Sequence, residues 1–589
     1  MPAPLFNENL DDPLALEACT DFRGGANRSV APHLLLPNEY AWATNCVMDV
    51  SGALQTRGGT SNVTAAPSCD RALLTALPGN EAKLLFVGDN IVRNTPLASP
   101  AGTAASVGSP ALGTSRSLAL GANKAYIQTS TDLWEYDGSA VYQVRRVVAT
   151  LGVAGSGYDV NNPPTVTVTP HASELGGRPT EAAVVSVTVL PGGSIGQVNV
   201  VSPGRGYTLP PTITVAAPTS GTTATIQSSL RTPPTGKFAV WHTNRLFTSN
   251  KSALNVSDFF DASYFAVANS TSIGGGDGQE ITGLASWDNF NLLVFKGQSV
   301  YLVVTDPLQA PADWQVQRLS TPVGSVAHRT AVTVGTDVWW LSQVGVVSVR
   351  RLLQETQREV NTAISLPIAD KVRAVNWLAA QSACAAYHDN KVFFALPLGS
   401  ATTPSHLFVY DTLAQRWMGE WAFKNEVTVR DFVTPYLGNP DLMLLLSDGR
   451  LVRYVEALDT DSTASSVQAI ETTQELRAFS FGEPTLPKSL LGLTLEFAES
   501  EADAVDVSFR VDEGAFVPAV TLGTTARQVL RLPFTLPATL VSPGNLTSAR
   551  TMMGTQFYYL QVRLKSLAGF LRLRALKLSA FGDNIVLTR

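Results

Sequence analysis

The sequence has almost no long helical periodicity, few charges and few cysteines, and each shortage excludes a class of protein. Charged residues make up 15% of the chain, against about 25% in a typical globular protein. The net charge is −6, and no basic run is interleaved with aromatic residues, so the chain lacks the basic stripe of a protein that grips nucleic acid. This composition still permits a surface along which DNA slides.

The sequence also has few cysteines, no long apolar run and few basic residues near its N-terminus. No apolar run approaches the roughly 18 residues of a membrane span. Glu8, Asp11 and Asp12 stand where a secretory signal would carry Lys or Arg, so we expect neither a membrane span nor such a signal. The cysteines are too scattered for a disulfide framework and indicate a reducing compartment; they are Cys19, Cys46, Cys69 and Cys384.

Motifs that carry chemistry are also few. Gly192–Gly196 matches G-x-S-x-G, but a strand pattern follows Ser194 where a nucleophile elbow requires a helix, so we interpret the match as a hairpin turn. The six histidines show neither H-x-H nor H-E-x-x-H spacing, and no Walker loop is present. The sequence therefore predicts no catalytic residue, no metal and no cofactor.

Two acidic clusters leave alternatives open. Asp258 and Asp261 could form a glycosidase carboxylate pair, and Asp277 with Glu280 could bind calcium. Aspartate in such loops also caps turns by accepting hydrogen bonds from the nearby backbone. We favour the turn interpretation for both clusters.

What the sequence has in abundance is short apolar strands, with 45 glycines and 35 prolines as turn signals between them. The unit of strand, polar turn and strand recurs, for example in NKAYIQTSTDLWEYDG, ITGLASWDNFNLLVFKGQSVYLVV and DLMLLLSDGRLVRYV. A hairpin cannot bury its apolar face alone, so consecutive hairpins must stack, and this pattern favours a β-propeller. Residues 352–375 alone predict one or two short helices.

Two segments depart from the propeller pattern. GSGYDVNNPPTVTV, beginning at Gly155, is repeated as GRGYTLPPTITV from Gly204, and from about residue 462 the alternating strands become longer. We predict an all-β chain, a β-propeller with an inserted small β module and a C-terminal β-sandwich. The expected parts are an N-terminal extended arm and first propeller strands (1–79), propeller (80–150 and 231–461), the inserted module with its GY…PPT repeat (151–230), and the sandwich (462–589).

The opening stretch reads DFRGGANRSVAPHLLLPNEYAWATN and is followed by SGALQTRGG. It resembles the N-terminal motif of propeller-type bacteriophage tail proteins. These are the tail nozzle, or tail tubular, proteins of short-tailed phages (podoviruses). The order of motifs continues through RLFTSNKSALNVSDFFDASYF and LFVYDTLAQRWMGEW and covers roughly two-thirds of the chain. At the N-terminus it is carried by Asp21, Phe22, Gly24, Gly25, Asn27, Pro32, Leu36, Glu39, Asn45, Gly52, Leu54, Arg57 and Gly59.

The resemblance implies a structural virion protein that is not an enzyme. It implies a homohexamer on the tail axis, below the portal and the head-to-tail adaptor or connector, with tail fibres or spikes as further partners. Genomic double-stranded DNA would pass through this tube during genome ejection, without specific binding. The protein would be assembled in the bacterial host cytoplasm and reside in the tail of the virion.

The opening arm has the composition of a docking segment, since glycine hinges it and proline stiffens it. We expect it to dock on the body or on a neighbouring copy; the candidate residues are Asp21, Phe22, Gly24, Gly25, Asn27 and Pro32. An equally open alternative is that the arm closes the chain's own propeller.

The negative charge suits a tube that must release DNA, because each neutralised phosphate adds affinity through counterion release. We therefore expect an acidic or neutral lumen, gated by constricting loops. Two other functions remain open: a host-binding tail protein or adhesin that presents residues 151–230 to the cell, and a propeller enzyme that trims polysaccharide. The enzyme would need two carboxylates about 5–10 Å apart in a cleft.

Overall fold

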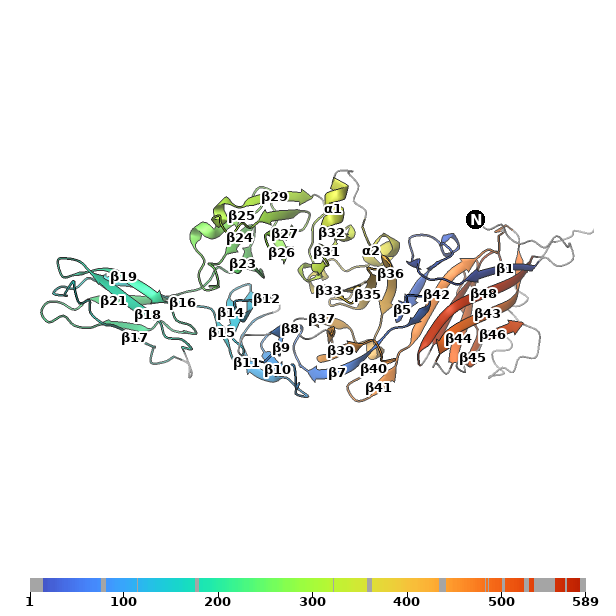
Figure 1. The fold of residues 1–589 in the computed structure, drawn as a ribbon, viewed down its shortest axis with the longest axis horizontal. Helices are drawn as coiled ribbons and strands as arrows, with labels where there is room; N and C mark the ends of the chain where they lie inside the picture. The colour runs from blue at the N-terminus through green and yellow to red at the C-terminus, as the bar shows by residue number, and fades with distance from the viewer. Residues whose placement is uncertain are drawn as a thin grey trace, which may run out of the picture. The chain divides into compact units, whose positions relative to one another are not determined.

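The structure, a computed structural model, is almost entirely β (Figure 1). It describes residues 14–75, 81–113, 115–174, 179–320, 323–356, 363–433, 441–482, 484–485, 487–500, 504–523, 529–533, 557–566 and 569–582. The chain forms two compact units, one made of Met1–Ala72 with Val326–Arg589 and the other of Leu73–Ser325.

The second unit contains four-stranded meanders, in which each strand pairs antiparallel with the next along the chain. This is the order of propeller blades. Their inner strands are buried runs such as Leu84–Val87 and Leu292–Phe295. The strands are β8 (Arg71–Thr75) to β11 (Ala105–Gly108), with β9 (Lys83–Val87) and β10 (Val92–Pro96); β12 (Arg116–Gly121), β13 (Lys124–Thr129), β14 (Leu133–Tyr136) and β15 (Val141–Gln143); β22 (Phe238–His242), β23 (Arg245–Asn250), β24 (Ala253–Val256) and β25 (Ser270–Ser272); and β26 (Ile281–Ser286), β27 (Asn291–Lys296), β28 (Val300–Val304) and β29 (Gln315–Ser320).

Blades in both units open with the same kind of hairpin turn. Two-residue loops ending in asparagine connect the first and second strands, and both loop residues have positive φ. Such turns match the right-handed twist of the strands, and asparagine tolerates this backbone conformation better than most residues. The loops are Ala122-Asn123, Thr243-Asn244 and Asp389-Asn390.

The first unit contains three further blade-like sheets. One of them, made of β37 to β39, takes its fourth strand from the N-terminal part of the chain, because β7 (Gly59–Ala65) pairs antiparallel with β39. The other strands are β30 (Val332–Val334), β31 (Asp337–Ser342) and β32 (Gly345–Ser348); β33 (Cys384–His388), β34 (Lys391–Leu396), β35 (His406–Asp411) and β36 (Arg416–Trp421); and β37 (Val429–Val433), β38 (Met443–Leu446) and β39 (Arg450–Val455). The expected short helices are confirmed as α1 (Val349–Thr356) and α2 (Ala369–Arg373).

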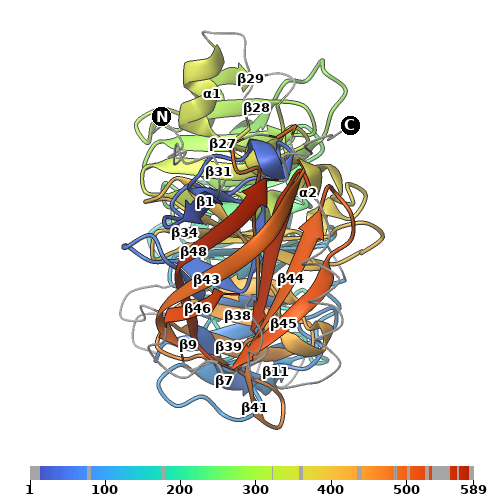
Figure 2. The ribbon, with the colours of Figure 1, turned by 90° about the vertical axis from the view of Figure 1, so that its right-hand side faces the viewer.

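The C-terminal part is a sandwich of long alternating strands, with β43, β44 and β48 prominent in Figure 2. Val505, Val507 and Phe509 alternate inward on β44, as the period-2 pattern predicts. One sheet has the order β46-β43-β48-β6-β5, with β1 also on β48, and the other continues from β36 as β4-β42-β47-β44-β45. The bounds are β1 (Leu14–Cys19), β4 (Trp42–Thr44), β5 (Cys46–Met48), β6 (Leu54–Thr56), β42 (Thr472–Phe479), β43 (Lys488–Ser500), β44 (Ala504–Val511), β45 (Val517–Gly523), β46 (Val529–Pro533), β47 (Leu560–Ser566) and β48 (Leu571–Gly582).

The N-terminal segment therefore contributes to two places at once. Strands β1, β4, β5 and β6 extend the sheets of the sandwich, whereas β7 joins a propeller blade. The sequence pattern predicted the propeller strands in this segment but not the strands given to the sandwich. The all-β fold itself, with propeller blades, an inserted β module and a C-terminal sandwich, is as the sequence predicts.

The inserted module has an internal two-fold arrangement. Its first repeat is β16 (Arg146–Val153), β17 (Val166–Thr169) and β18 (Val184–Val189), and its second is β19 (Ile195–Ser202), β20 (Thr212–Val215) and β21 (Thr225–Arg231). The first strand of each repeat pairs with the third strand of the other, and the second strands pair together. Each repeat thus completes the other, and neither forms a sheet by itself.

The repeated tyrosines fix this exchange. The hydroxyl of Tyr158 accepts a hydrogen bond from the backbone N–H of Ala224 at 2.8 Å, and that of Tyr207 accepts one from Ala183 at 2.9 Å. Both tyrosines are buried in a core built only from the module's own residues. The sequence repeat Gly-x-Gly-Tyr is therefore a structural device that ties each repeat to its partner.

We predict that the module can be removed without unfolding the remaining chain. Arg146 and Arg231 are register partners on β16 and β21, so the two ends of the insertion meet and a short glycine-serine linker can replace residues 146–231. The shortened chain should keep its β circular dichroism and unfold cooperatively on heating. Loss of cooperative unfolding would contradict an independent module core.

Candidate functional site

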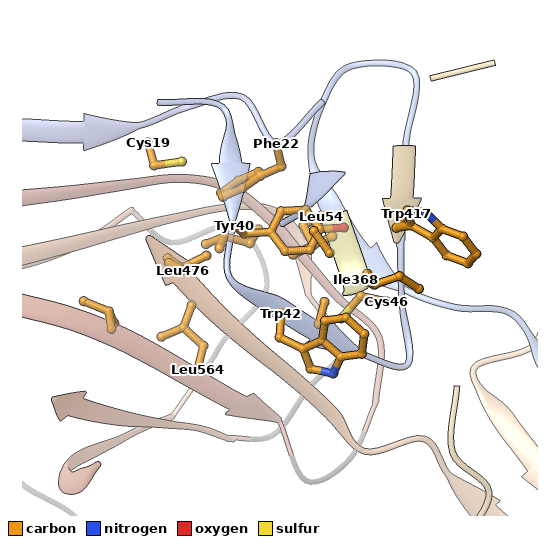
Figure 3. Packing of buried hydrophobic residues seen from close by; sticks show 14 of the residues in the cluster. Cys19, Phe22, Tyr40, Trp42, Cys46, Leu54, Ile368, Trp417, Leu476 and Leu564 are labelled. Carbon is orange, nitrogen blue, oxygen red and sulfur yellow. The ribbon is translucent and has the colours of Figure 1, made fainter. Parts of the chain in front are cut away.

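The N-terminal arm, residues 21–36, docks on the chain's own unit. Phe22 is fully buried and packs edge-to-face on Tyr40, with ring centroids 6.5 Å apart (Figure 3). The backbone N–H of Asn27 donates to Tyr40 O at 3.0 Å, and its side chain donates to Glu39 at 3.0 Å. Asp21 instead stays at the surface and pairs with Arg23 at 2.9 Å. The arm is thus anchored by one aromatic side chain and by backbone hydrogen bonds.

The two other kinds of candidate residue, glycine and proline, shape the path of this arm. Gly25 has φ +75°, and a Cβ there would lie 2.6 Å from Cβ of Arg416, so both conformation and space require glycine. Gly24 donates its N–H to Asn38 O at 2.9 Å. Pro32 begins the 3₁₀ turn Pro32–Leu34. The six predicted arm residues therefore lie along one docked segment, and a contact with a neighbouring copy stays a prediction.

Arg57 is the centre of a fully buried polar network in the first unit. Its five N–H groups all have acceptors: Nε donates to Asn45 Oδ1 (2.9 Å), Nη1 to Gly58 O (2.8 Å) and Asp461 Oδ1 (3.0 Å), and Nη2 to Ala422 O (3.2 Å) and Asp461 Oδ2 (2.6 Å). The exposed fraction of the Arg57 side chain is 0%, and that of Asp461 is 9%. A buried charge is tolerated only when it is paired and hydrogen-bonded in this way.

The same network ties the blade that ends in β36 to the sandwich. Asn45 accepts from the N–H of Ala422 at 2.7 Å, and its amide donates to Glu471 O at 2.8 Å, just before β42. The rings of Trp421 and Phe423 lie 5.4 and 5.0 Å from the Arg57 guanidinium carbon. We call these residues, with Asp461, the Arg57 junction.

Two of the glycines that carry the resemblance lie where the chain approaches itself closely, Gly59 beside the junction and Gly52 beside the arm. Gly59 begins β7, and a Cβ there would lie 2.0 Å from Thr460 O, so no side chain fits between the two strands. The N–H of Phe22 donates to Gly52 O at 3.0 Å. The sequence gives these residues in order but contains no local signal for Asp461, because that partner lies 404 positions from Arg57.

A cavity of about 390 Å³, the arm cavity, opens beside the docked segment. It has basic groups from Arg351 and Arg416, one carboxylate from Glu39, and the buried ring of Trp417, whose Nε1 donates to Ile364 O at 3.0 Å. Glu39 is already engaged by the arm through Asn27 and the N–H of Leu36. The lining residues are Gly24, Ala26, Asn27, Glu39, Arg351, Ala363, Ile364, Leu366, Pro367, Tyr410, Gln415, Arg416 and Trp417.

A second cavity, of about 220 Å³, lies in the other unit between the inserted module and the β12–β15 sheet. We call it the module cavity. Its charged residues are Lys124, Glu135, Arg145, Glu181, Arg205 and Asp261. The hydroxyl of Tyr142 donates to Glu135 Oε1 at 2.7 Å, and burial raises the pKa of Glu135 to about 7.

In the loop with Asp277 and Glu280, a lysine ammonium pairs with the carboxylate that could have bound calcium. The ammonium of Lys296, whose side chain is fully buried, lies 2.7 and 2.8 Å from the two carboxylate oxygens of Asp277 and 3.2 Å from Gly274 O. Burial would raise the pKa of Asp277, but the hydrogen bonds from Lys296, the N–H of Gln279 and Tyr301, together with the Lys296 charge, hold that pKa below its ordinary range. Glu280 pairs separately with Lys237 at 3.0 Å. These contacts support the turn interpretation and oppose a calcium site here.

The other candidate residues also have local structural partners. Ser194 lies in the turn between β18 and β19, where its carbonyl accepts from Leu190 N, so the hairpin interpretation of G-x-S-x-G is confirmed. Asp261 Oδ1 accepts from the N–H and the hydroxyl of Ser263 at 2.9 and 2.6 Å, which is an Asx turn. Asp258 accepts from the N–H of Phe259 at 3.1 Å.

His242 and the four cysteines have buried side chains. His242 Nδ1 lies 2.8 Å from Ser286 Oγ, and Nε2 lies 2.8 Å from Thr305 Oγ1. Thr305 donates to Phe290 O, so it accepts from Nε2–H, and Nδ1 then accepts from Ser286. Burial lowers the pKa of His242 to about 4. The four cysteines are buried thiols, with no disulfide among the residues that the structure describes.

Neither a metal-binding cluster nor a membrane-spanning helix occurs among the described residues. No group of three or more His, Cys, Asp or Glu side chains in the described ranges is placed to hold a metal ion. Nor does any helix of the described chain combine the length and apolar character needed to cross a bilayer.

We predict that Asp461→Asn destabilises the first unit by about 3–5 kcal/mol, because it leaves the buried Arg57 charge uncompensated. Urea unfolding followed by tryptophan fluorescence measures this change. The matched control is Asp21→Asn at the exposed Arg23 pair, where the expected loss is about 0–1 kcal/mol. Equal losses of unfolding free energy in the two variants would show that the buried pair stabilises the unit no more than the exposed pair does.

We also predict acid sensitivity from His242. Its folded pKa is lowered, so below about pH 6.5 the unfolded chain takes up a proton that the folded chain refuses until about pH 4. This one group should cost roughly 3 kcal/mol of stability across that interval. His242→Gln should flatten the decline in unfolding free energy over this range, whereas the exposed His171→Gln should not. An unchanged pH profile in His242→Gln would contradict this assignment.

Comparison with known proteins identifies distant similarities among solved structures. No protein-family model and no curated protein sequence matches this chain. Among solved structures, the chain is similar to Chaetomium thermophilum Raptor (TM-score 0.32, 9% identity, 68% of this chain and 29% of that chain). It is also similar to BBS1N in complex with ARL6DN (TM-score 0.26, 10% identity, 70% and 98%) and to the N-terminal domain of Nup159 (TM-score 0.25, 8% identity, 70% and 97%). The chain thus spans less than a third of the Raptor chain's length.

Proposed function

We propose that the chain is a structural protein of a bacteriophage tail, six copies of which form the nozzle through which genomic DNA leaves. The observation that carries this proposal is the coherence of the N-terminal motif. Asn45, Arg57 and Gly59 lie in or beside the buried Arg57 junction, whereas Gly52 accepts a hydrogen bond from Phe22 of the arm and Leu54 is fully buried in the core. Their order therefore reflects a shared structural device, which supports the resemblance to tail nozzle proteins.

The docked arm presents an apolar surface suited to assembly. Val30, Leu34 and Leu36 are exposed by 41, 65 and 60%, although the segment around them is fixed to the body. Exposed apolar groups on an ordered segment are typical of a protein–protein contact. A closed ring requires such a surface to meet a different patch on the next copy. We propose that these residues contribute to the contact between neighbouring copies.

The charge of the chain supports passage of DNA. Six copies would multiply a net charge of −6 and give an assembly that repels phosphate. Many basic side chains are already paired, among them Arg57 with Asp461, Lys296 with Asp277 and Arg329 with Asp431. A pore lined by a continuous belt of Lys and Arg would contradict this part of the proposal.

Electron microscopy of the parent particle tests the nozzle proposal. We expect six copies around the tail axis, below the adaptor, with fibres or spikes attached further out. A solitary copy at the periphery of the tail would instead favour the adhesin alternative.

A variant series tests the arm's part in assembly. Leu34→Asp with Leu36→Asp should prevent ring formation while leaving the monomer folded, because charged side chains would be buried at the contact. Leu413→Asp is the control, since Leu413 is 75% exposed but lies outside the arm. Rings that form equally well with all these variants would contradict the arm's role, and circular dichroism checks the fold.

A further inference from the structure

The inserted module departs from its own two-fold symmetry at the module cavity. At the first Gly-x-Gly-Tyr, Ser156 Oγ and Thr222 Oγ1 of the other repeat form a neutral hydrogen bond of 3.1 Å. At the equivalent place beside the second Gly-x-Gly-Tyr, Arg205 Nε and the carboxylate of Glu181 form an ion pair of 3.4 Å. The charged pair lines the module cavity, where Arg205 also approaches Glu135 to 3.7 Å. The module's fold does not require these charges, since the neutral pair of Ser156 and Thr222 stands at the equivalent place.

We propose that the module cavity binds a neutral, polyhydroxylated ligand the size of one saccharide unit, between a buried carboxyl floor and an aromatic rim. This inference is independent of whether the chain forms a tail ring.

The floor of the cavity is the carboxyl group of Glu135, which is only 6% exposed. Its Oε1 accepts a hydrogen bond from the hydroxyl of Tyr142 and pairs with the ammonium of Lys124. The guanidinium of Arg205 lies further from the same oxygen. With its pKa raised to about 7 by burial, the carboxyl group of Glu135 can accept a hydrogen bond from a ligand hydroxyl or donate one to it. A buried carboxyl group that lines a cavity suits a hydroxyl-bearing ligand.

The rim contains an aromatic residue held in a rarely populated backbone conformation. Phe260 is 60% exposed and has φ +54°, in the left-handed region that bulky residues avoid. Its N–H donates to Asn244 O at 2.8 Å, which fixes the loop, and Asp261 beside it also lines the cavity. Strain of this kind is concentrated at binding sites. An exposed ring at the mouth offers an apolar face against which the C–H face of a sugar can pack.

The balance of charge selects a neutral ligand. Three basic and three acidic side chains line the cavity, namely Lys124, Arg145, Arg205, Glu135, Glu181 and Asp261. An anion such as phosphate would meet three carboxyl groups, and a cation would meet three basic groups. The guanidinium and ammonium groups of this lining can donate hydrogen bonds, and its carboxyl groups can accept them. A polyol uses donors and acceptors together, without bringing a net charge into the cavity.

Saturation-transfer NMR on the full chain tests this proposal, with D-glucose, D-galactose, L-rhamnose and N-acetyl-D-glucosamine as probes. We expect transfer to at least one of these sugars. Phe260→Ala and Arg205→Ser, which copies the first repeat, should each weaken its binding by about tenfold. Phe290→Ala is the matched control, because Phe290 is 51% exposed in the same unit and does not line the cavity.

Glu135→Gln supplies an independent readout, since it keeps the shape of the floor but removes its titration. Sugar binding by the wild-type chain should change between pH 6 and 8, around the pKa of about 7, and this change should vanish in Glu135→Gln. Three results would overturn the proposal: no transfer to any of the four sugars, equal binding by Phe260→Ala and Phe290→Ala, or tighter binding of inorganic phosphate than of any sugar. Melting curves for each variant establish that the fold is retained.

Discussion

The buried pair of Arg57 and Asp461 is the constraint on which the first unit depends. A guanidinium group can remain in a protein interior only if its donors are matched, and here five donors meet five acceptors. These acceptors come from the N-terminal segment, from the end of the last strand in one blade and from the chain that leads into the sandwich. The segment that precedes β7 is thereby fixed against both the blade and the sandwich.

This constraint explains why the N-terminal segment has so little chemistry of its own. Its task is geometric: Phe22 fills the core, Gly25 provides a left-handed turn, and Gly59 lets two strands approach closely. The exposed apolar residues of the arm are the part that the chain's own contacts do not use. A rigid arm with an unused apolar face is suited to contact another protein, because little entropy remains to be lost on docking.

Local patterns predicted the local structure well. Strand alternation, asparagine turns and the Gly-x-Gly-Tyr repeat act within a few residues, so hairpins, the inserted module and the short helices could be inferred from sequence. Pairings across hundreds of positions could not, because nothing near Trp42 indicates that β4 lies beside β42. The same limit applies to sites. The acidic loop at Asp277 was visible in the sequence, whereas the Lys296 ammonium that occupies its carboxylate was not. The module cavity was missed because its residues come from three separate segments, and only the replacement of Ser156 by Arg205 between the repeats could have drawn attention to it.

Hydrogen exchange with mass spectrometry on Asp461→Asn tests the central claim most directly, namely that one buried junction holds the N-terminal segment, the blade and the sandwich together. If it does, amide protection should fall together in residues 42–65, 416–421 and 472–479, while strands of the inserted module keep theirs. Loss of protection confined to the immediate neighbours of Asp461, with β4 and β42 unchanged, would contradict the claim.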